Sequence, residues 1–376
     1  MLPETLLAFA SIYAIVILVF AIAVSAAQYP SDTRIQPTVS IVIAARNEEE
    51  NIERCLSSVT ELSYPTHLLE VIVVDDRSTD KTQAIVSEFS KNYPYINLLV
   101  SSPPVGHLRG KVNAVTQGIE LSKGEILFFT DADCVVPKGW LRETVKYYTD
   151  ESVGIVAGFT SLRANNWFEC IQALDWFILF SIAAATIKLH FPVTAVGNNL
   201  SVRRKAYDQV GGYRNLPFSV TEDYALFHAI ISRTKFTARF PLDTTTLVES
   251  GACKSWKELY VQRKRWFRGG RDMDSKRLVV FGVLYAFHLF MLVSLVILRS
   301  PVVWLALLLK VAVDFLLAVP ALNTFRRWNL VKYFLQFQLY YIFYVLAFPI
   351  ITIFGKEVVW KERTFKREDQ VNKKAP

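Results

Sequence analysis

The sequence predicts a Rossmann-like α/β domain with a mostly parallel sheet, attached to transmembrane helices. Short apolar runs rich in β-branched residues alternate with stretches of helical periodicity between residues 38 and 160, as in βαβ units. Four other runs are nearly all apolar and approach the ~20 residues that a spanning helix needs. In addition, 52% of the 376 residues are hydrophobic and the mean hydropathy is +0.26, which is high for a soluble enzyme.

The first apolar run, residues 5–27, carries no charge and is long enough to cross a bilayer. Its end, Ser25-Ala26-Ala27, resembles the small-residue cleavage site of a signal peptide. However, no basic segment precedes the run, and the run is longer than the apolar part of a signal peptide. We therefore predict an uncleaved anchor over residues 1–30 and a linker over residues 28–37 that contains two prolines.

Two buried strands are predicted at the start of the α/β domain, over residues 38–45 and 69–76. Both are apolar and β-branched, and each is followed by polar residues and then by apolar positions at helical spacing. Strands and helices that alternate at this spacing indicate a parallel sheet. No Gly-x-Gly-x-x-Gly follows the first strand, so the pattern is not that of an ordinary dinucleotide-binding fold.

Further strands are predicted at residues 96–100, 125–129 and 153–159, with a helix at residues 111–121. Lys111 opens that helix, where it could reach an anion that the helix N–H groups also bind. A solvated lysine explains the same position equally well.

Two acidic residues, Asp131 and Asp133, follow the strand at residues 125–129. Open α/β sheets bind ligands beyond the carboxyl ends of their strands. Both carboxylates should be ionised at neutral pH, because a free Asp titrates near ~4. Adjacent carboxylates suit Mg²⁺ or Mn²⁺, which such sites share with the phosphates of a substrate. Taken alone, the pattern is weak and an ordinary turn after a strand explains it better.

A long aromatic and apolar segment, residues 166–189, is interrupted by Glu169, Gln172, Asp175 and Lys188. We predict a helix that lies at the membrane interface or packs on the sheet.

The next helical pattern covers residues 224–231, and Thr221 is a possible N-cap for it. Glu222 and Asp223 stand at the same helix start. Acidic residues there complement the helix dipole, which by itself accounts for both of them.

A basic helical segment, residues 255–271, leads into the C-terminal part of the chain. Three apolar runs follow it, at residues 278–298, 301–319 and 333–354. The basic flank, residues 263–277, places the large globular part on the cytoplasmic side of the membrane. If all three runs cross the bilayer, however, the basic tail at residues 356–374 lies outside, against the positive-inside tendency.

Polar residues interrupt the last two runs. Gln336, Gln338 and Pro349 make the final run the least lipid-like, so interfacial, re-entrant and bundle-packed placements all stay open. Lys310 and Asp314 lie four residues apart inside the preceding run, where an ion pair has either a functional or a structural role.

The charge balance excludes some classes of partner. The net charge is +8, and the Lys and Arg residues cluster beside the apolar runs, which fits an anionic membrane face and a phosphorylated substrate. No basic arm, zinc-finger spacing or RNA-binding signature indicates nucleic acid. The four cysteines form no Cys-x-x-Cys pair, which argues against a disulfide framework or zinc site and fits a reducing compartment.

Six short motifs occur in a fixed order over residues 38–270. They are Val39-Ser40-Ile41-Val42-Ile43-Ala44-Ala45-Arg46-Asn47-Glu48, Val74-Asp75-Asp76-Arg77-Ser78-Thr79-Asp80, Gly110-Lys111, Asp131-Ala132-Asp133, Thr221-Glu222-Asp223 and Gln262-Arg263-Lys264-Arg265-Trp266. Together they resemble the family 2 glycosyltransferases, in the membrane-bound branch that includes ceramide glucosyltransferases and hyaluronan and cellulose synthases. The segment Trp360-Lys361-Glu362-Arg363 also resembles a tail element of some members, with Glu362 in place of a glycine.

The resemblance implies a GT-A fold and inverting transfer from a nucleotide-activated sugar. It implies a divalent cation, Mn²⁺ or Mg²⁺, bound by Asp133, and a general base at Asp223. On the donor side it implies contacts with the nucleotide or the donor sugar from Ala45, Arg46, Glu48, Asp76, Lys111 and Asp131. Around the diphosphate and acceptor it implies Glu222, Gln262, Arg265 and Trp266. Arg77 replaces the glycine that is common after the Asp pair, which leaves the base specificity open.

The sequence therefore predicts an inverting glycosyltransferase embedded in the membrane, the plasma membrane in a prokaryote, with its catalytic domain in the cytoplasm. The expected donor is a nucleotide sugar, UDP-linked, and the expected acceptor is a lipid or a glycan. A processive polysaccharide synthase and a non-catalytic lipid-handling protein are the alternatives. The predicted domains are an anchor (1–30), a GT-A domain (38–270), C-terminal helices (275–356) and a basic tail (357–376). Sugar, acceptor and oligomeric state are not specified.

Overall fold

The computed structural model describes residues 2–26, 35–104, 106–270, 275–297, 300–354, 357–360 and 363–366. The chain divides into two compact units. The helical unit comprises residues 1–27, 162–193 and 252–356, and the sheet unit comprises residues 28–161, 194–251 and 357–376. Residues 162–193 and 252–270, which the sequence prediction included in the GT-A domain, thus group with the apolar helices.

Parts of some sequence predictions lie outside the described residues. They are Ala27 of the cleavage-like sequence, most of the linker at 28–37, residues 271–274 and 298–299, and most of the basic tail.

A seven-stranded sheet forms the centre of the sheet unit, in the order β3-β2-β1-β4-β7-β5-β8. Its strands are β1 (Val39–Ala45), β2 (Leu69–Asp75), β3 (Ile96–Val100), β4 (Ile126–Phe129), β5 (Val153–Ala157), β7 (Leu200–Arg203) and β8 (Thr237–Arg239). β7 pairs antiparallel with β4 and β5, and the other pairs within this sheet are parallel. The predicted α/β class with a mostly parallel sheet is confirmed.

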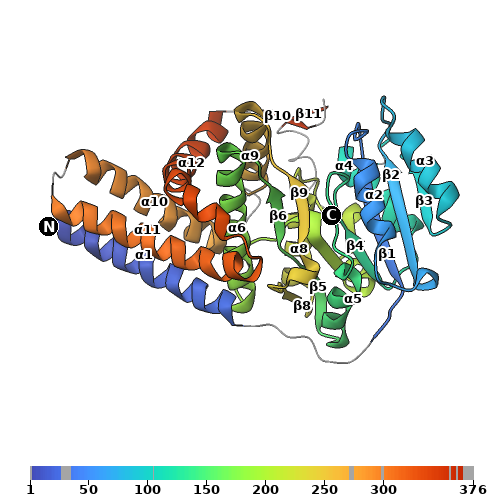
Figure 1. Cartoon of the computed structure of the whole chain (residues 1–376), viewed down its shortest axis with the longest axis horizontal. Coiled ribbons are helices and arrows are strands. Elements are labelled where there is room, and N and C mark those ends of the chain that lie inside the picture. The colour runs from blue at the N-terminus through green and yellow to red at the C-terminus, as the bar shows by residue number, and fades with distance from the viewer. Residues whose placement is uncertain are drawn as a thin grey trace. The chain divides into compact units, whose positions relative to one another are not determined.

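Helices and short 3₁₀ turns connect these strands (Figure 1). The helices are α2 (Ile52–Thr60), α3 (Thr82–Asn92), α4 (Gly110–Leu121), α5 (Trp140–Val145), α7 (Arg204–Gln209) and α8 (Glu222–Arg233). The 3₁₀ turns are η1 (Thr66–Leu68), η2 (Lys146–Thr149), η3 (Gly197–Asn199), η4 (Tyr213–Asn215) and η5 (Thr244–Thr246). Two further pairs of strands are β6 (Thr160–Arg163) with β9 (Val248–Gly251), and β10 (Glu357–Trp360) with β11 (Arg363–Lys366).

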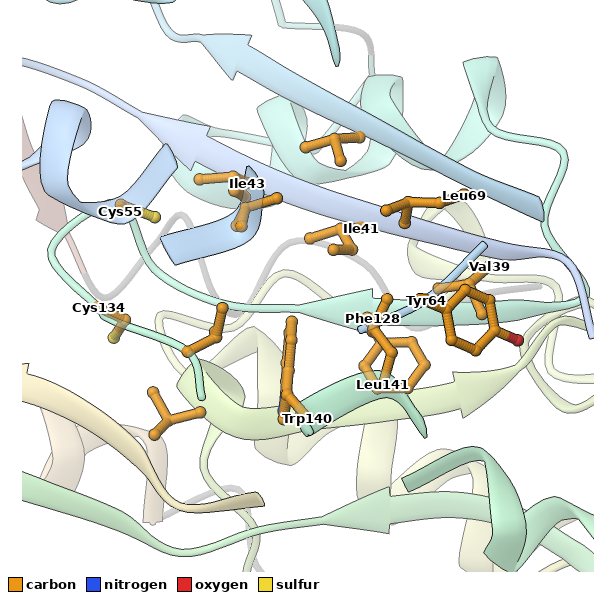
Figure 2. Close-up of a cluster of buried hydrophobic side chains, with 14 of the residues drawn as sticks. Val39, Ile41, Ile43, Cys55, Tyr64, Leu69, Phe128, Cys134, Trp140 and Leu141 are labelled. Carbon is orange, nitrogen blue, oxygen red and sulfur yellow. The ribbon is translucent and has the colours of Figure 1, made fainter. Parts of the chain in front are cut away.

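One hydrophobic core lies against a face of β1. Because side chains alternate along a strand, Val39, Ile41 and Ile43 all enter this core (Figure 2). The rings of Phe128 from β4 and Trp140 from α5 meet edge to face within it, with centroids 5.0 Å apart and planes at 76°. This packing fixes β1 and β4 beside each other, and the loops that carry the candidate site follow these two strands.

The helical unit contains α1 (Leu2–Ser25), α6 (Trp167–Lys188), α9 (Trp256–Gly270), α10 (Ser275–Ile297), α11 (Pro301–Thr324), η6 (Trp328–Tyr333) and α12 (Phe334–Phe354). Among the described residues, four segments are long and apolar enough to cross a membrane: Pro3–Ser25, Trp167–Lys188, Pro301–Thr324 and Trp328–Ile351. In α10, the described apolar segment is the shorter Gly282–Ile297. α1, α10 and α11 pack against one another along their length (Figure 1).

α6 differs from its predicted placement. The sequence suggested a helix at the membrane interface or packed on the sheet, but α6 belongs to the helical unit and packs against α1, α11 and α12. Most of its side chains are buried, including Gln172 and Asp175. Asp175 pairs with Arg263 of α9 and Gln172 bonds to the backbone of Cys253, so these two polar residues do not mark a surface helix.

A buried polar network joins three helices of this unit. The Nζ atom of Lys310 lies 2.8 Å from Oδ2 of Asp314, and both side chains are almost fully buried. Asp314 also accepts hydrogen bonds from the Tyr13 hydroxyl at 2.6 Å and from Nε2 of Gln338 at 3.1 Å. Lys310 in turn donates to Oε1 of Gln338. The network thus ties α1, α11 and α12 together, which favours the structural role for this ion pair.

Gly118 allows α4 to approach the other face of the sheet. A Cβ atom at this position would lie 2.7 Å from Cγ1 of Val42 and 2.8 Å from Cγ2 of Val74. Both neighbours are rigid β-branched side chains on central strands, so they yield little.

We expect Gly118→Ala to lower the free energy of unfolding by about 1–3 kcal/mol, the usual cost of overpacking. Thermal unfolding of the purified protein measures this change. Gly282→Ala is the matched control, since a Cβ atom there meets nothing within 4 Å. A Gly118→Ala protein as stable as the unmodified chain would contradict the packing described for α4.

Candidate functional site

Three neighbouring strands bring polar side chains to one edge of the sheet. The register of β1 pairs Ala45 with Asp75 of β2, and β4 lies parallel on the other side of β1. Arg46, Asp76 and Asp131 follow the ends of these strands, at the edge where open α/β sheets bind ligands. A hollow at this edge is lined by Lys111, Asp131, Gly197, Glu222 and Asp223, among others.

Lys111 connects the two acidic segments of the hollow. Its Nζ atom lies 2.7 Å from Oδ1 of Asp131 and 2.8 Å from Oε1 of Glu222. Burial alone would lower the pKa of Lys111, but the two carboxylates outweigh this effect and raise it. The ammonium group is therefore charged and held in place, so the solvated lysine that the sequence also allowed is excluded.

Asp223 is presented at the start of α8. Its Oδ2 accepts a 2.6 Å hydrogen bond from the backbone N–H of Gly197, and its Oδ1 accepts a 2.8 Å bond from the N–H of Tyr224. Burial and then the negative charge of Glu222 raise the pKa of Asp223 to about 6, against the lowering effect of Lys111 and the two N–H groups. A carboxylate with this pKa is ionised at neutral pH and still accepts a proton readily, which suits a general base.

Thr221 occupies the N-cap position of α8, but its side chain makes no capping hydrogen bond. The carboxylate of Asp223 bonds instead to the backbone N–H groups of Gly197 and Tyr224. The two acidic residues at this helix start therefore do more than complement the helix dipole: one forms an ion pair and the other faces the hollow.

The loop after β4 suits a divalent cation. Oδ2 of Asp133 accepts a 3.1 Å hydrogen bond from the buried hydroxyl of Ser250. Burial, then the charges of Asp131 and Glu48, raise the pKa of Asp133, so this region carries negative charge that a cation would relieve. Among the described residues, no group of three or more His, Cys, Asp or Glu side chains could hold a metal. Two carboxylates with substrate phosphates and water are nevertheless a common Mg²⁺ or Mn²⁺ site.

Arg46 and Asp76 form the opposite side of this edge. The guanidinium NH1 of Arg46 donates to the carbonyl oxygens of Asp76 at 2.7 Å and Arg77 at 3.1 Å. The N–H of Asp76 donates to the carbonyl of Ala45 at 2.8 Å, and its Oδ1 accepts a 2.9 Å bond from Ser101. These contacts fix Ala45, Arg46 and Asp76 relative to one another.

Two neighbouring turns place the rest of this side. Arg77 has φ = 58° and Asn47 has φ = 51°, both in the left-handed region that favours glycine. A positive φ explains why a glycine is common at this position in the family that the sequence resembles, and Arg77 adopts the same backbone conformation. Glu48 accepts a 3.0 Å hydrogen bond from Nδ2 of Asn51, and its own N–H donates to Thr82.

The remaining predicted residues lie in the other unit. Gln262, Arg265 and Trp266 are on α9 of the helical unit, whereas the nine other predicted site residues, discussed above, belong to the sheet unit. Their contribution to a shared site with Asp223 stays a prediction. On α9 itself, Trp266 packs against Trp176 of α6, with ring centroids 5.8 Å apart.

Three features, two in the site and one in the helical unit, escaped the sequence interpretation. Gly197 bonds the candidate base, and a Cβ atom there would lie 2.8 Å from Cβ of Asp223. The Gly-Asn-Asn turn at 197–199 was a visible signal for a tight turn, but nothing local connects it with residue 223. Neither the bond from Ser250 to Asp133 nor the pairing of Arg263 with Asp175 has a sequence signature, because each joins segments far apart in the chain.

Comparison with known proteins identifies the family. The family model described as glycosyl transferase family 21 matches residues 4–371. The chain belongs to this family. It is a glycosyltransferase, so the resemblance drawn from the motifs is confirmed, and the non-catalytic alternative loses its support.

Curated relatives include proteins with several activities. The chain is 27% identical to the probable glycosyltransferase YdaM of Bacillus subtilis, over 88% of this chain and 85% of that protein. It is 32% identical to the beta-monoglucosyldiacylglycerol synthase of Nostoc sp., over 62% of this chain and 49% of that protein. It is 27% identical to the poly-beta-1,6-N-acetyl-D-glucosamine synthase of Staphylococcus epidermidis, over 62% and 55%. The chain therefore spans about half of the length of the latter two relatives.

A solved structure supports the fold. The mannosyltransferase PcManGT from Pyrobaculum calidifontis, in complex with GDP-Man and Mn²⁺, superposes with a TM-score of 0.62. The match covers 95% of this chain and 100% of that chain at 19% identity. The predicted GT-A fold, with one N-terminal and further C-terminal apolar helices, is confirmed.

The position of Lys111 predicts how stability depends on pH. In Lys111→Met, Asp131 and Glu222 lose their counter-ion. Asp223 loses the positive charge that lowers its pKa. The pKa of Asp223 in the folded state then rises further above its unfolded value, so folding is favoured below the unfolded pKa and this advantage is lost as pH rises through the folded pKa. We expect the free energy of unfolding to fall by up to about 3 kcal/mol at pH 7.5 and by clearly less at pH 5. The value at pH 7.5 is the low end for a broken buried pair, because Lys111 is partly exposed.

Thermal unfolding at the two pH values measures this difference. Lys111→Arg keeps the charge and is the control, for which we expect a small loss that does not change with pH. If Lys111→Met lowers the free energy of unfolding equally at both pH values, the loss comes from packing, and the ion pairs do not stabilise the sheet unit.

Proposed function

We propose that this glycosyltransferase moves a single sugar, with inversion, from a nucleotide-diphosphate donor to a lipid or lipid-linked acceptor at the cytoplasmic membrane face. The observation that carries the proposal is the hollow in which Lys111 bridges Asp131 and Glu222 beside Asp223. This hollow lies at the ligand-binding edge of a GT-A sheet, in a chain whose described part contains four helices apolar enough to cross a membrane. A relative that is 32% identical is named for the glucosylation of diacylglycerol, which supports a lipid acceptor.

Asp223 has the properties that an inverting transfer needs. In such a reaction a base removes the proton of the acceptor hydroxyl as that oxygen attacks the sugar from the side opposite the leaving diphosphate. Two backbone N–H groups orient the carboxylate, and its pKa of about 6 keeps it ionised at cytoplasmic pH. A positioned base of this kind contributes ~10²–10⁴-fold to the rate.

Lys111 and the acidic loop belong to the donor side. Asp131 and Asp133 would hold the divalent cation, which when bound neutralises the charge that develops on the leaving diphosphate. The ammonium group of Lys111 stands 2.7 Å from Asp131, within reach of a donor that binds at this loop. Arg46 and Asp76, fixed to each other through the backbone, form the side that would take the nucleoside.

Arg265 and Trp266 are the proposed contributors from α9. A guanidinium group offers paired donors to a diphosphate, and an indole ring offers an apolar face to a sugar ring or a lipid headgroup. The basic residues of α9 also suit the anionic surface of a membrane, and both roles are compatible.

A processive polysaccharide synthase is the second candidate, since a relative that is 27% identical carries that name. The product separates the two. Purified full-length protein is incubated with a UDP-sugar, Mn²⁺ and micelles that contain diacylglycerol, and the lipid fraction is analysed by mass. We expect a glycolipid with one added sugar, and a long polymer would favour the synthase.

We expect Asp223→Asn to reduce this transfer by ~10²–10⁴-fold, because the amide accepts no proton. The amide still bonds to the N–H of Gly197, so the fold and the binding of nucleotide should persist. Asp208→Asn, on an exposed surface of the sheet unit, is the matched control with unchanged activity. Transfer by Asp223→Asn at the rate of the unmodified protein would refute the assignment of the base.

Donor binding should require both the nucleotide and the cation. Nucleoside diphosphates are compared for thermal stabilisation with and without Mn²⁺, and we expect UDP with Mn²⁺ to raise the midpoint most. Saturation to 100 times Kd corresponds to about 2.7 kcal/mol of stabilisation. In Asp133→Asn, the share of this thermal stabilisation that depends on Mn²⁺ should disappear. If GDP raises the thermal midpoint more than UDP, the expected base specificity is wrong. If the stabilisation by nucleotide is the same with and without Mn²⁺, the cation site is refuted.

A further inference from the structure

One arginine within the segment Gln262–Trp266 does not face solvent. The side chain of Arg263, on α9, is 1% exposed, and its NH2 atom lies 2.5 Å from Oδ2 of Asp175 on α6, which is 5% exposed. Both residues belong to the helical unit. A buried charge of this kind persists only with a close partner, so α9 and α6 meet through this pair.

Aromatic rings enclose the same guanidinium group. Its Cζ atom lies 4.2 Å from the ring centroid of Trp266 and 5.4 Å from that of Tyr344 on α12. Trp176, the neighbour of Asp175, packs on Trp266 from α6 at 5.8 Å. The planar guanidinium group is therefore held by an ion pair and by stacking. Trp266 is held directly by the residue three positions before it.

This arrangement sets the rotation of α9. Residues three and four apart share one face of a helix, so Gln262, Arg265 and Trp266 follow one another along a face. Arg263 lies three positions before Trp266, so these two side chains also share a face, on the side of α9 that is turned toward α6 and α12. When Arg263 is fixed, the helix cannot rotate about its axis without breaking the pair, and the direction of Arg265 is fixed with it.

Stability alone does not explain such a pair. Well-packed apolar residues in place of a buried ion pair are often neutral or stabilising, and the best-attested use of buried polar groups is to fix register. We infer that Asp175 and Arg263 are positioning residues, which hold α9 so that Arg265 and Trp266 meet the reacting groups. The inference rests on the proposed function, since it concerns how efficiently sugar is transferred.

The decisive variant replaces both members of the pair, Asp175→Leu with Arg263→Met. Because no buried charge is left unpaired, we expect a thermal midpoint equal to or above that of the unmodified protein. The register of α9 is lost, however, so kcat should fall on the order of 10- to 100-fold, the effect of a small misplacement. KM for the donor should change much less than kcat, since the residues proposed for the nucleoside and the cation lie in the sheet unit and only Arg265 is proposed to reach the diphosphate. A purely structural pair would give the opposite result, lower stability or full activity.

A second variant, Arg263→Lys, keeps the charge but loses the planar stack on Trp266. We expect a folded protein whose kcat falls more than its donor KM rises, and this variant decides alone if the double variant does not fold. Lys257→Met removes an exposed cation from the same helix, so its kcat should equal that of the unmodified chain. Full kcat in either test variant overturns the inference while the proposed function stands. An unmodified protein that transfers no sugar overturns both.

Discussion

The bridge that Lys111 makes between Asp131 and Glu222 is the interaction on which the candidate site depends. It joins the start of α4, the loop after β4 and the start of α8, three segments that are far apart in the chain. Without the ammonium group, carboxylates from two of these segments would repel each other across the hollow. With it, Glu222 is neutralised in part, and Asp223 beside it keeps a pKa near 6 instead of a higher one.

The sheet was predictable because its signals are local. Each strand before the acidic loop is a short β-branched run, and each is followed by polar residues that mark its carboxyl end. Since parallel strands share that edge, Arg46, Asp76 and Asp131 were expected together, and the register of β1 with its neighbours places them there. The antiparallel insertion of β7 between β4 and β5 was not predictable, because strand order depends on packing between distant segments.

The helical unit shows the limit of periodicity more clearly. Asp175 in an apolar run looked like a reason to place α6 at a surface, and Lys310 with Asp314 left two roles open. In the structure Asp175 of α6 is buried against Arg263 of α9. The Lys310–Asp314 pair of α11 is buried against Tyr13 of α1 and Gln338 of α12. A pattern along one helix shows that a charge is present, but only the neighbouring helix decides whether that charge is solvated, paired or reactive.

The charges of the hollow also constrain the order in which ligands are accommodated. Asp131, Glu222 and Asp223 line the hollow, Asp133 lies in the loop that carries Asp131, and Lys111 pairs with Asp131 and Glu222. A nucleoside diphosphate alone would add further negative charge to this edge, at a cost that grows where water is excluded. On the proposed function, a divalent cation that enters with the diphosphate would restore the balance, since the acidic loop would then face a positive charge. The proposal therefore implies that this loop repels the free donor and binds the donor in its cation-bound form.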